Sequence, residues 1–217
     1  NTTGSCNVFI GDASGYSNGT ISGNTFIGQS SGELNTSGNK NTFIGYKSGK
    51  RTTTGGRNTS VGYYAGFNNT IGQENTSIGY EAGASALRAI HNTFIGCQAG
   101  YLTGNGSSNT FVGYRSGYSN THGNENTFIG DSAGYSNTVG TCNVFIGAQS
   151  GYTIGTVSGN TFVGFHAGRV ATGSPNTFIG NQAGRKNTVG VKNVFLGFRA
   201  CYSNDLGIEN TFIGNQA

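Results

Sequence analysis

Apolar and polar positions alternate within a short block that recurs along the whole chain. The block reads Asn, then Thr or Val, then usually Phe, then Ile, Val or Leu, then Gly, and it begins at 13 asparagines. All intervals between these asparagines are 17 residues, except that from Asn160 to Asn176, which is 16 and contains the single proline, Pro175. Positions in a repeat are numbered below from this Asn, 1 to 17.

A period of this length predicts a parallel β-solenoid, an all-β fold in which each repeat forms one coil. β-Branched and aromatic residues at positions 2 to 4 favour a strand, and the frequent Gly at positions 5, 9 and 15 favours turns. About 13 coils are therefore expected, and the whole chain, 1–217, is predicted to be one continuous array. The array starts and stops within a repeat and shows no capping sequence, so a segment of a longer fibrous protein or an end-to-end filament is expected.

Successive residues of a strand face opposite sides, so position 3 should point opposite to positions 2 and 4. We expect position 3 to fill the interior, with the small Ala or Ser of position 8 across from it. The predicted interior stack is Phe9, Phe26, Phe43, Phe94, Phe111, Phe128, Phe145, Phe162, Phe178, Phe195 and Phe212. The predicted outer strip includes Thr25, Ile27, Thr42, Ile44, Thr93, Ile95, Thr127, Ile129, Thr177 and Ile179.

The Asn at position 1 should form a column of amides that bond to their neighbours in adjacent coils. Its members are Asn7, Asn24, Asn41, Asn58, Asn75, Asn92, Asn109, Asn126, Asn143, Asn160, Asn176, Asn193 and Asn210.

Two neighbouring repeats depart from the pattern. Ser60 and Ser77 replace Phe at position 3, and the interior should narrow there, with Tyr63, Tyr64 and Tyr80 as candidates to compensate. Residues 84–91 lack Gly, and the spacing of their apolar residues allows a short helical turn.

Composition then excludes several classes of protein. Gly accounts for 40 of 217 residues but Pro for only one, which excludes collagen. Apolar runs are too short for a membrane-spanning helix, so no membrane insertion is expected.

The sequence indicates neither an enzyme nor a metal protein. Its four Cys lie in widely separated repeats, and no two of its three His share one site. No set of nucleophile, base and acid and no pair of carboxylates is visible, so no catalytic residue, metal site or cofactor is predicted.

Basic and aromatic side chains offer a possible binding surface. Lys40, Lys47, Lys50, Arg51 and Arg57 cluster in sequence, which is compatible with an anionic glycan or nucleic acid. Because the net charge is only +4, a solvated surface is the preferred interpretation and nucleic acid is not expected. Tyr columns at positions 6 and 10 could hold sugar rings or could simply shield corner glycines.

The repeated Asn-Thr-Phe-Ile-Gly-x-x-Ala/Ser-Gly motif resembles the arrays of tail-fibre-domain and surface-fibre proteins. It is also similar to the repeat in the head domains of trimeric autotransporter adhesins. The resemblance implies a left-handed β-roll and an extracellular location, at a cell surface or in a virion fibre. The adhesin repeat is about three residues shorter and has Ala where this chain has Phe.

Three functional interpretations follow. The first is a structural or adhesive fibre segment, the shaft or head of an adhesin, filament or phage fibre, whose partner is itself as a homotrimer or an end-to-end filament. The second is an ice-binding solenoid that uses the rows of Thr and Ile side chains that successive coils present at positions 2 and 4. The third is a fibre that binds host-surface glycans.

Overall fold

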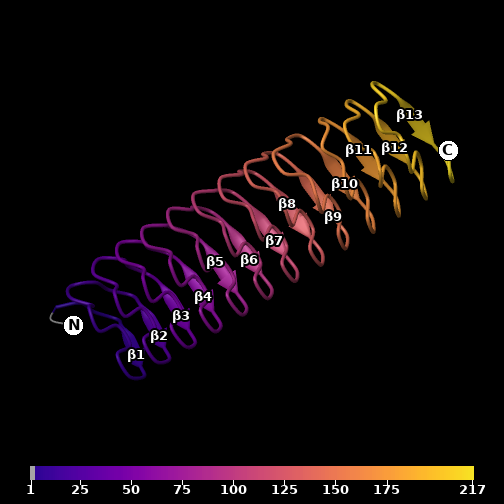
Figure 1. Cartoon of the computed structure of the whole chain (residues 1–217). Coiled ribbons are helices and arrows are strands. Elements are labelled where there is room, and N and C mark those ends of the chain that lie inside the picture. Colours follow the sequence, from indigo (N-terminus) through magenta and orange to yellow (C-terminus); the bar gives the residue numbers. More distant parts are fainter. Residues whose placement is uncertain (1–2) are drawn as a thin grey trace. The chain divides into compact units, whose positions relative to one another are not determined.

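The computed structural model describes residues 3–217 and has the predicted architecture, an all-β parallel solenoid with a 17-residue repeat (Figure 1). The described residues contain no helix. Each strand spans positions 2 to 4 of one repeat. The strands are β1 (Val8–Ile10), β2 (Thr25–Ile27), β3 (Thr42–Ile44), β4 (Thr59–Val61), β5 (Thr76–Ile78), β6 (Thr93–Ile95), β7 (Thr110–Val112), β8 (Thr127–Ile129), β9 (Val144–Ile146), β10 (Thr161–Val163), β11 (Thr177–Ile179), β12 (Val194–Leu196) and β13 (Thr211–Ile213).

The chain divides into two compact units, one up to Ser108 with β1 to β6 and one from Asn109 with β7 to β13. Within each unit, every strand pairs in parallel with the strand one repeat further along, as in Phe26↔Phe43 and Phe128↔Phe145. The return path of each coil is bonded in the same way; the Leu34 N–H, for example, donates to the Lys50 carbonyl at 3.0 Å. The prediction of one continuous array stays a prediction, as does handedness.

Position 3 lies in the interior of both units. Nine of the predicted stack, from Phe26 to Phe195, are fully buried, while Phe9 and Phe212 are half-buried. Neighbouring rings lie nearly parallel, with centroids 5.0 Å apart for Phe26 and Phe43 and 4.8 Å for Phe128 and Phe145. The Ala or Ser at position 8 is also buried, except at Ser14 and Ala217 in the terminal repeats, and the Ser31 hydroxyl donates to the Phe43 carbonyl at 2.9 Å. The largest buried side chains of each unit therefore form a column of rings, which Ser60 and Ser77 interrupt in the first unit.

The Asn of position 1 forms the predicted ladder. The Asn126 amide nitrogen donates to the Asn109 Oδ1 at 3.1 Å and to the Gly140 carbonyl at 2.8 Å. The Asn126 Oδ1 in turn accepts the Asn143 backbone N–H at 3.0 Å. Each amide thus links one coil to both neighbours and satisfies backbone groups that are buried away from water.

Gly is required at position 5, immediately after each strand. Gly130 has φ +132°, and a Cβ there would lie 2.7 Å from the Gly147 carbonyl carbon and oxygen. The close approach of successive coils leaves no room for a side chain, which explains why this position is Gly in every repeat.

Two expectations for the irregular repeats are wrong. Residues 84–91 form no helical turn, because the Ser85 and Arg88 N–H groups bond to carbonyls of the next coil and Ile90 makes a parallel bridge with Gln73. Tyr63 and Tyr80 do not fill the space beside Ser60 and Ser77, since both rings are almost half exposed. Beside Ser77, the Phe94 ring of the next coil lies close by instead; a Cβ at Gly83 would be 2.6 Å from both the Phe94 Cδ2 and the Ser77 hydroxyl oxygen.

Candidate functional site

The most regular exposed feature of each unit is the Thr/Ile strip, which we define as the side chains at positions 2 and 4 of all repeats. Position 2 is Thr or Val, position 4 is Ile, Val or Leu, and neither is charged in any repeat. The strip is only partly covered; Ile95, Ile129 and Ile179 remain 37–38% exposed.

The register of the strands fixes the order of the strip. Thr25 pairs with Thr42, and Ile27 with Ile44, and the same correspondence holds at the later strand pairs of the first unit. Paired strands lie about 4.8 Å apart. Each unit therefore presents two ranks of uncharged side chains at a constant spacing.

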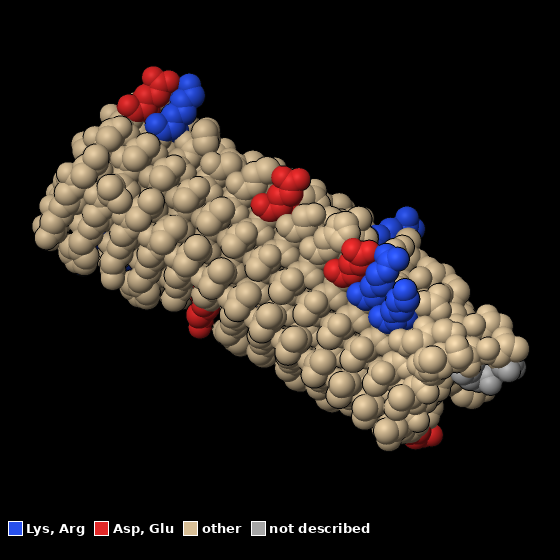
Figure 2. All heavy atoms as spheres, turned by 180° about the vertical axis from the view of Figure 1, so that it is seen from behind, with Lys and Arg blue, Asp and Glu red and all other residues tan. Residues whose placement is uncertain are grey.

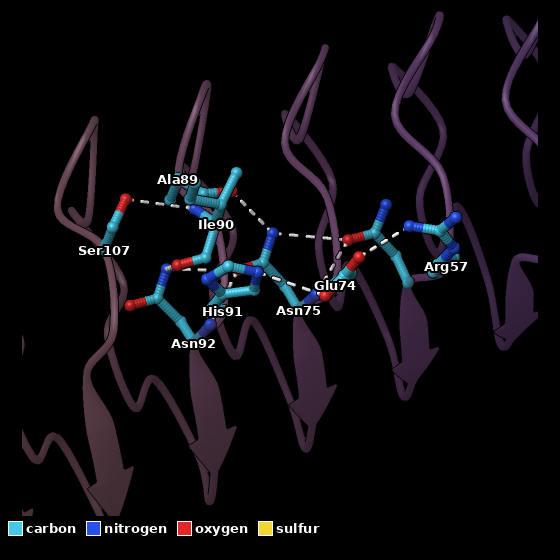
Figure 3. A network of polar contacts seen from close by, with 9 residues as sticks. Arg57, Glu74, Asn75, Ala89, Ile90, His91, Asn92 and Ser107 are labelled. Atoms are coloured by element: carbon cyan, nitrogen blue, oxygen red, sulfur yellow. Dashed lines mark hydrogen bonds and ion pairs between the residues drawn. The ribbon is translucent and has the colours of Figure 1, made fainter.

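On the face shown in Figure 2, charged residues are few and stand in small separate groups among uncharged residues. In the first unit, Glu74 accepts a hydrogen bond from Arg57 Nη1 at 2.6 Å and faces His91 Nε2 at 3.1 Å (Figure 3). The Arg57 guanidinium holds the pKa of Glu74 below its usual value. These three side chains occupy position 17 of successive repeats. They therefore form a row of charged and ionisable groups along one corner of the coil.

The basic residues that are close in sequence separate into two groups. Lys47, Lys50 and Arg51 lie at positions 7, 10 and 11, and each has a partner. Lys47 donates to the Tyr64 hydroxyl at 2.9 Å, which raises the pKa of Lys47, and Lys50 pairs with Glu33 at 3.1 Å. The Arg51 guanidinium lies 5.4 Å from the centre of the Phe67 ring.

Lys40 and Arg57 form the second group, at position 17. They line a hollow of about 390 Å³ together with hydroxyl and amide side chains of neighbouring repeats. The sequence pattern did not reveal this hollow. The available signal was a change at position 16, which is Asn39, Gly56 and Gln73 in three successive repeats.

Tyr columns occur in both units but offer little ring surface. Tyr63 stacks on Tyr46 and on Tyr80 with centroids 5.1 and 5.3 Å apart, and Tyr135 stacks on Tyr118 and Tyr152 at 5.2 and 5.1 Å. Because the faces of the middle rings are covered by other rings, a sugar cannot stack on them. The columns present ring edges and hydroxyl groups.

A second buried asparagine rank was missed by the sequence analysis. The Asn35 amide donates to the Gly38 carbonyl at 2.9 Å, and its Oδ1 accepts the Gly38 N–H at 2.9 Å. The same Asn recurs at position 12, three residues before the Gly of position 15, in much of the chain. The recurrent Asn-Thr-x-Gly spacing was the available signal. These residues close the corner of the coil and make no exposed site.

Titratable side chains are dispersed in the described part of the chain. No group of three or more His, Cys, Asp or Glu side chains between residues 3 and 217 is placed to hold a metal ion. Cys6, Cys97, Cys142 and Cys201 are free thiols. His166 is packed against Phe165, and burial, with smaller contributions from Arg185 and Arg169, lowers the pKa of His166.

Residues 3–217 contain no helix of the length and hydrophobicity needed to cross a bilayer.

Comparison of the chain with protein-family models, with curated proteins and with solved structures finds no match.

Proposed function

We propose that this chain is a structural segment of an extracellular fibre, a shaft or head at a cell surface or in a virion, that associates with copies of itself through the Thr/Ile strip. The observation that carries the proposal is the strip itself, uncharged in every repeat and held in register within each unit. Contiguous exposed apolar surface on a folded protein is typical of an interaction site.

The interior of the coil supports a structural role rather than a chemical one. The column of rings and the Asn ladder occupy the inside of the coil in the described residues, and they bind neighbouring coils to each other. Such a scaffold acts through rigidity and repetition, because identical weak contacts add along its length.

The first test replaces Ile44, Ile95 and Ile129 by Lys in one variant. Burial of three ammonium groups without partners is expected to abolish association, while the coils remain folded because these side chains point away from the core. Light scattering measures the mass, and circular dichroism measures the fold.

A matched control replaces Leu34, Leu102 and Val139 by Lys. These residues are 38–46% exposed but lie outside the strip, so association should be retained with the same added charge. Unchanged assembly of the strip variant, or dissociation of both variants alike, would refute the assignment of the strip.

A second candidate function is ice binding, and one observation favours it. In the first unit, five successive repeats place Thr at position 2, namely Thr25, Thr42, Thr59, Thr76 and Thr93, beside an aliphatic rank. Hydroxyl groups at a constant spacing can order water molecules. If this function holds, the chain shows thermal hysteresis and shapes ice crystals, and the Ile44, Ile95 and Ile129 to Lys variant loses both. No effect at millimolar protein would eliminate this candidate.

A further inference from the structure

The hollow beside Lys40 lies where position 16 of the repeat is a glycine. Position 16 is Asn39 and Gln73 in the two flanking repeats. Gly56, at the same position in the repeat between them, has no side chain. A Cβ at Gly56 would lie 3.0 Å from the Asn39 carbonyl oxygen, so even a small side chain would crowd this place. The hollow at this corner of the coil has a volume of about 390 Å³, and Gly56 is one of its lining residues.

Several side chains around the hollow have unused hydrogen-bonding capacity. Within the described part of the chain, the hydroxyls of Ser37 and Thr54 and the amide of Gln73 make no hydrogen bond to other residues. All three side chains are exposed and belong to three successive repeats. Together they provide donors and acceptors for a ligand that carries hydroxyl groups.

The two cations at the hollow differ in their partners. Arg57 bonds to Glu74, whose other carboxylate oxygen faces His91 (Figure 3). Lys40 makes no ion pair with any residue of the described chain. Its side chain passes close to Gly23 of the preceding repeat, where an added Cβ would lie 3.6 Å from the Lys40 Cγ. In the second unit the lysine at the same position, Lys192, pairs with Glu209 at 2.9 Å. Lys40 thus brings an uncompensated positive charge to a cavity lined by polar groups.

We propose that the hollow at Gly56 binds an acidic sugar unit of a polysaccharide, with the Lys40 ammonium group bonding to its carboxylate or sulfate. The hydroxyls of Ser37 and Thr54 and the Gln73 amide bond to the hydroxyl groups of the sugar. Binding does not depend on self-association, because no strand residue, and hence no residue of the Thr/Ile strip, lines the hollow.

Other ligand classes fit less well. Every residue lining the hollow is polar, charged or Gly, which disfavours an apolar ligand. No aromatic residue lines it either, whereas single-stranded nucleic acid is held by stacking of bases on aromatic rings along a basic groove. Two cations are also few for a polyanion whose affinity comes from many phosphate contacts.

The test is isothermal titration calorimetry on the full chain at low ionic strength. The probes are a galacturonate hexamer for the carboxylate, a heparin-derived hexasaccharide for the sulfate, maltohexaose as the neutral control, and a thymidine oligonucleotide. We expect one or both acidic sugars to bind, and the neutral sugar and the oligonucleotide to bind at least tenfold more weakly. The two acidic probes show which group the site prefers.

Three variants localise the binding. Lys40→Gln should weaken it about tenfold by removing one charge-assisted hydrogen bond. Gly56→Gln, which introduces the residue found at the same repeat position in Gln73, should weaken it by occupying part of the hollow without changing the charge. Lys192→Gln, the matched control, removes a lysine from the same repeat position and should leave the affinity unchanged. Circular dichroism and melting curves establish that each variant is folded.

Four results would overturn the proposal. The first is that neither acidic sugar binds, the second is that maltohexaose binds equally well, and the third is that the oligonucleotide binds more tightly. The fourth is an equal loss of affinity for Lys40→Gln and Lys192→Gln, which would indicate general attraction to positive charge. The mass of each variant is measured in parallel, so that loss of sugar binding with retained assembly separates this site from the Thr/Ile strip.

Discussion

Replacement of Phe128 by Ala is expected to lower the free energy of unfolding by about 3–5 kcal/mol. The Phe128 ring is fully buried and lies between Phe111 and Phe145, 4.8 Å from each and nearly parallel to both. The core is one ring wide, so no second layer of side chains can move into the space that the substitution leaves. Chemical denaturation followed by far-ultraviolet circular dichroism measures the effect.

Phe198→Ala is the control for this prediction. Phe198 belongs to the same unit but lies at position 6 and is 43% exposed, so its replacement should cost about 1 kcal/mol or less. Equal losses for Phe128→Ala and Phe198→Ala would contradict a core made of a single column of rings.

Replacement of Asn126 by Ala should have the next largest effect, a loss of about 2–4 kcal/mol. The amide of Asn126 bonds to Asn109, to the Gly140 carbonyl and to the Asn143 N–H. Its removal leaves the Asn143 N–H buried without an acceptor, whereas the Gly140 carbonyl keeps the Asn137 amide as a donor at 3.1 Å. An unpaired buried donor is costly. The same denaturation experiment provides the measurement.

Asn181→Ala is the matched control, because Asn181 lies in the same unit with its side chain exposed to solvent. A change within about 0.5 kcal/mol is expected there. If Asn126→Ala were equally mild, the ladder would not contribute to the stability of the coil.

The repeat made most of the fold predictable. A residue such as Phe128 or Asn126 recurs at one position because one environment recurs, so the strand, the interior face and the ladder could be read from the spacing alone. The Asn of position 12 is less regular, since five repeats carry Thr52, Ala86, Thr103, Ile154 or Ala171 there. Its role also depends on the conformation of a corner, which spacing does not reveal.

The features that escaped prediction are those where one repeat differs from its neighbours. Residues 84–91 have a helix-like spacing, yet the hydrogen bonds of Ser85 and Arg88 to the next coil determine the backbone. Tyr63 and Tyr80 were expected to compensate for Ser60 and Ser77, but both rings are almost half exposed, and the Phe94 ring lies close to Ser77. The hollow at Gly56 is lined by residues of several repeats, which the spacing of the repeats does not bring to notice.

Burial of the Thr/Ile strip against copies of the chain is tested most directly by the mass of the unmodified chain in solution. Light scattering measures this mass across a series of protein concentrations. We expect a multiple of the mass of one chain, either a discrete trimer or a distribution that grows with concentration. A strictly monomeric chain at the highest concentration would rule out self-association through the strip.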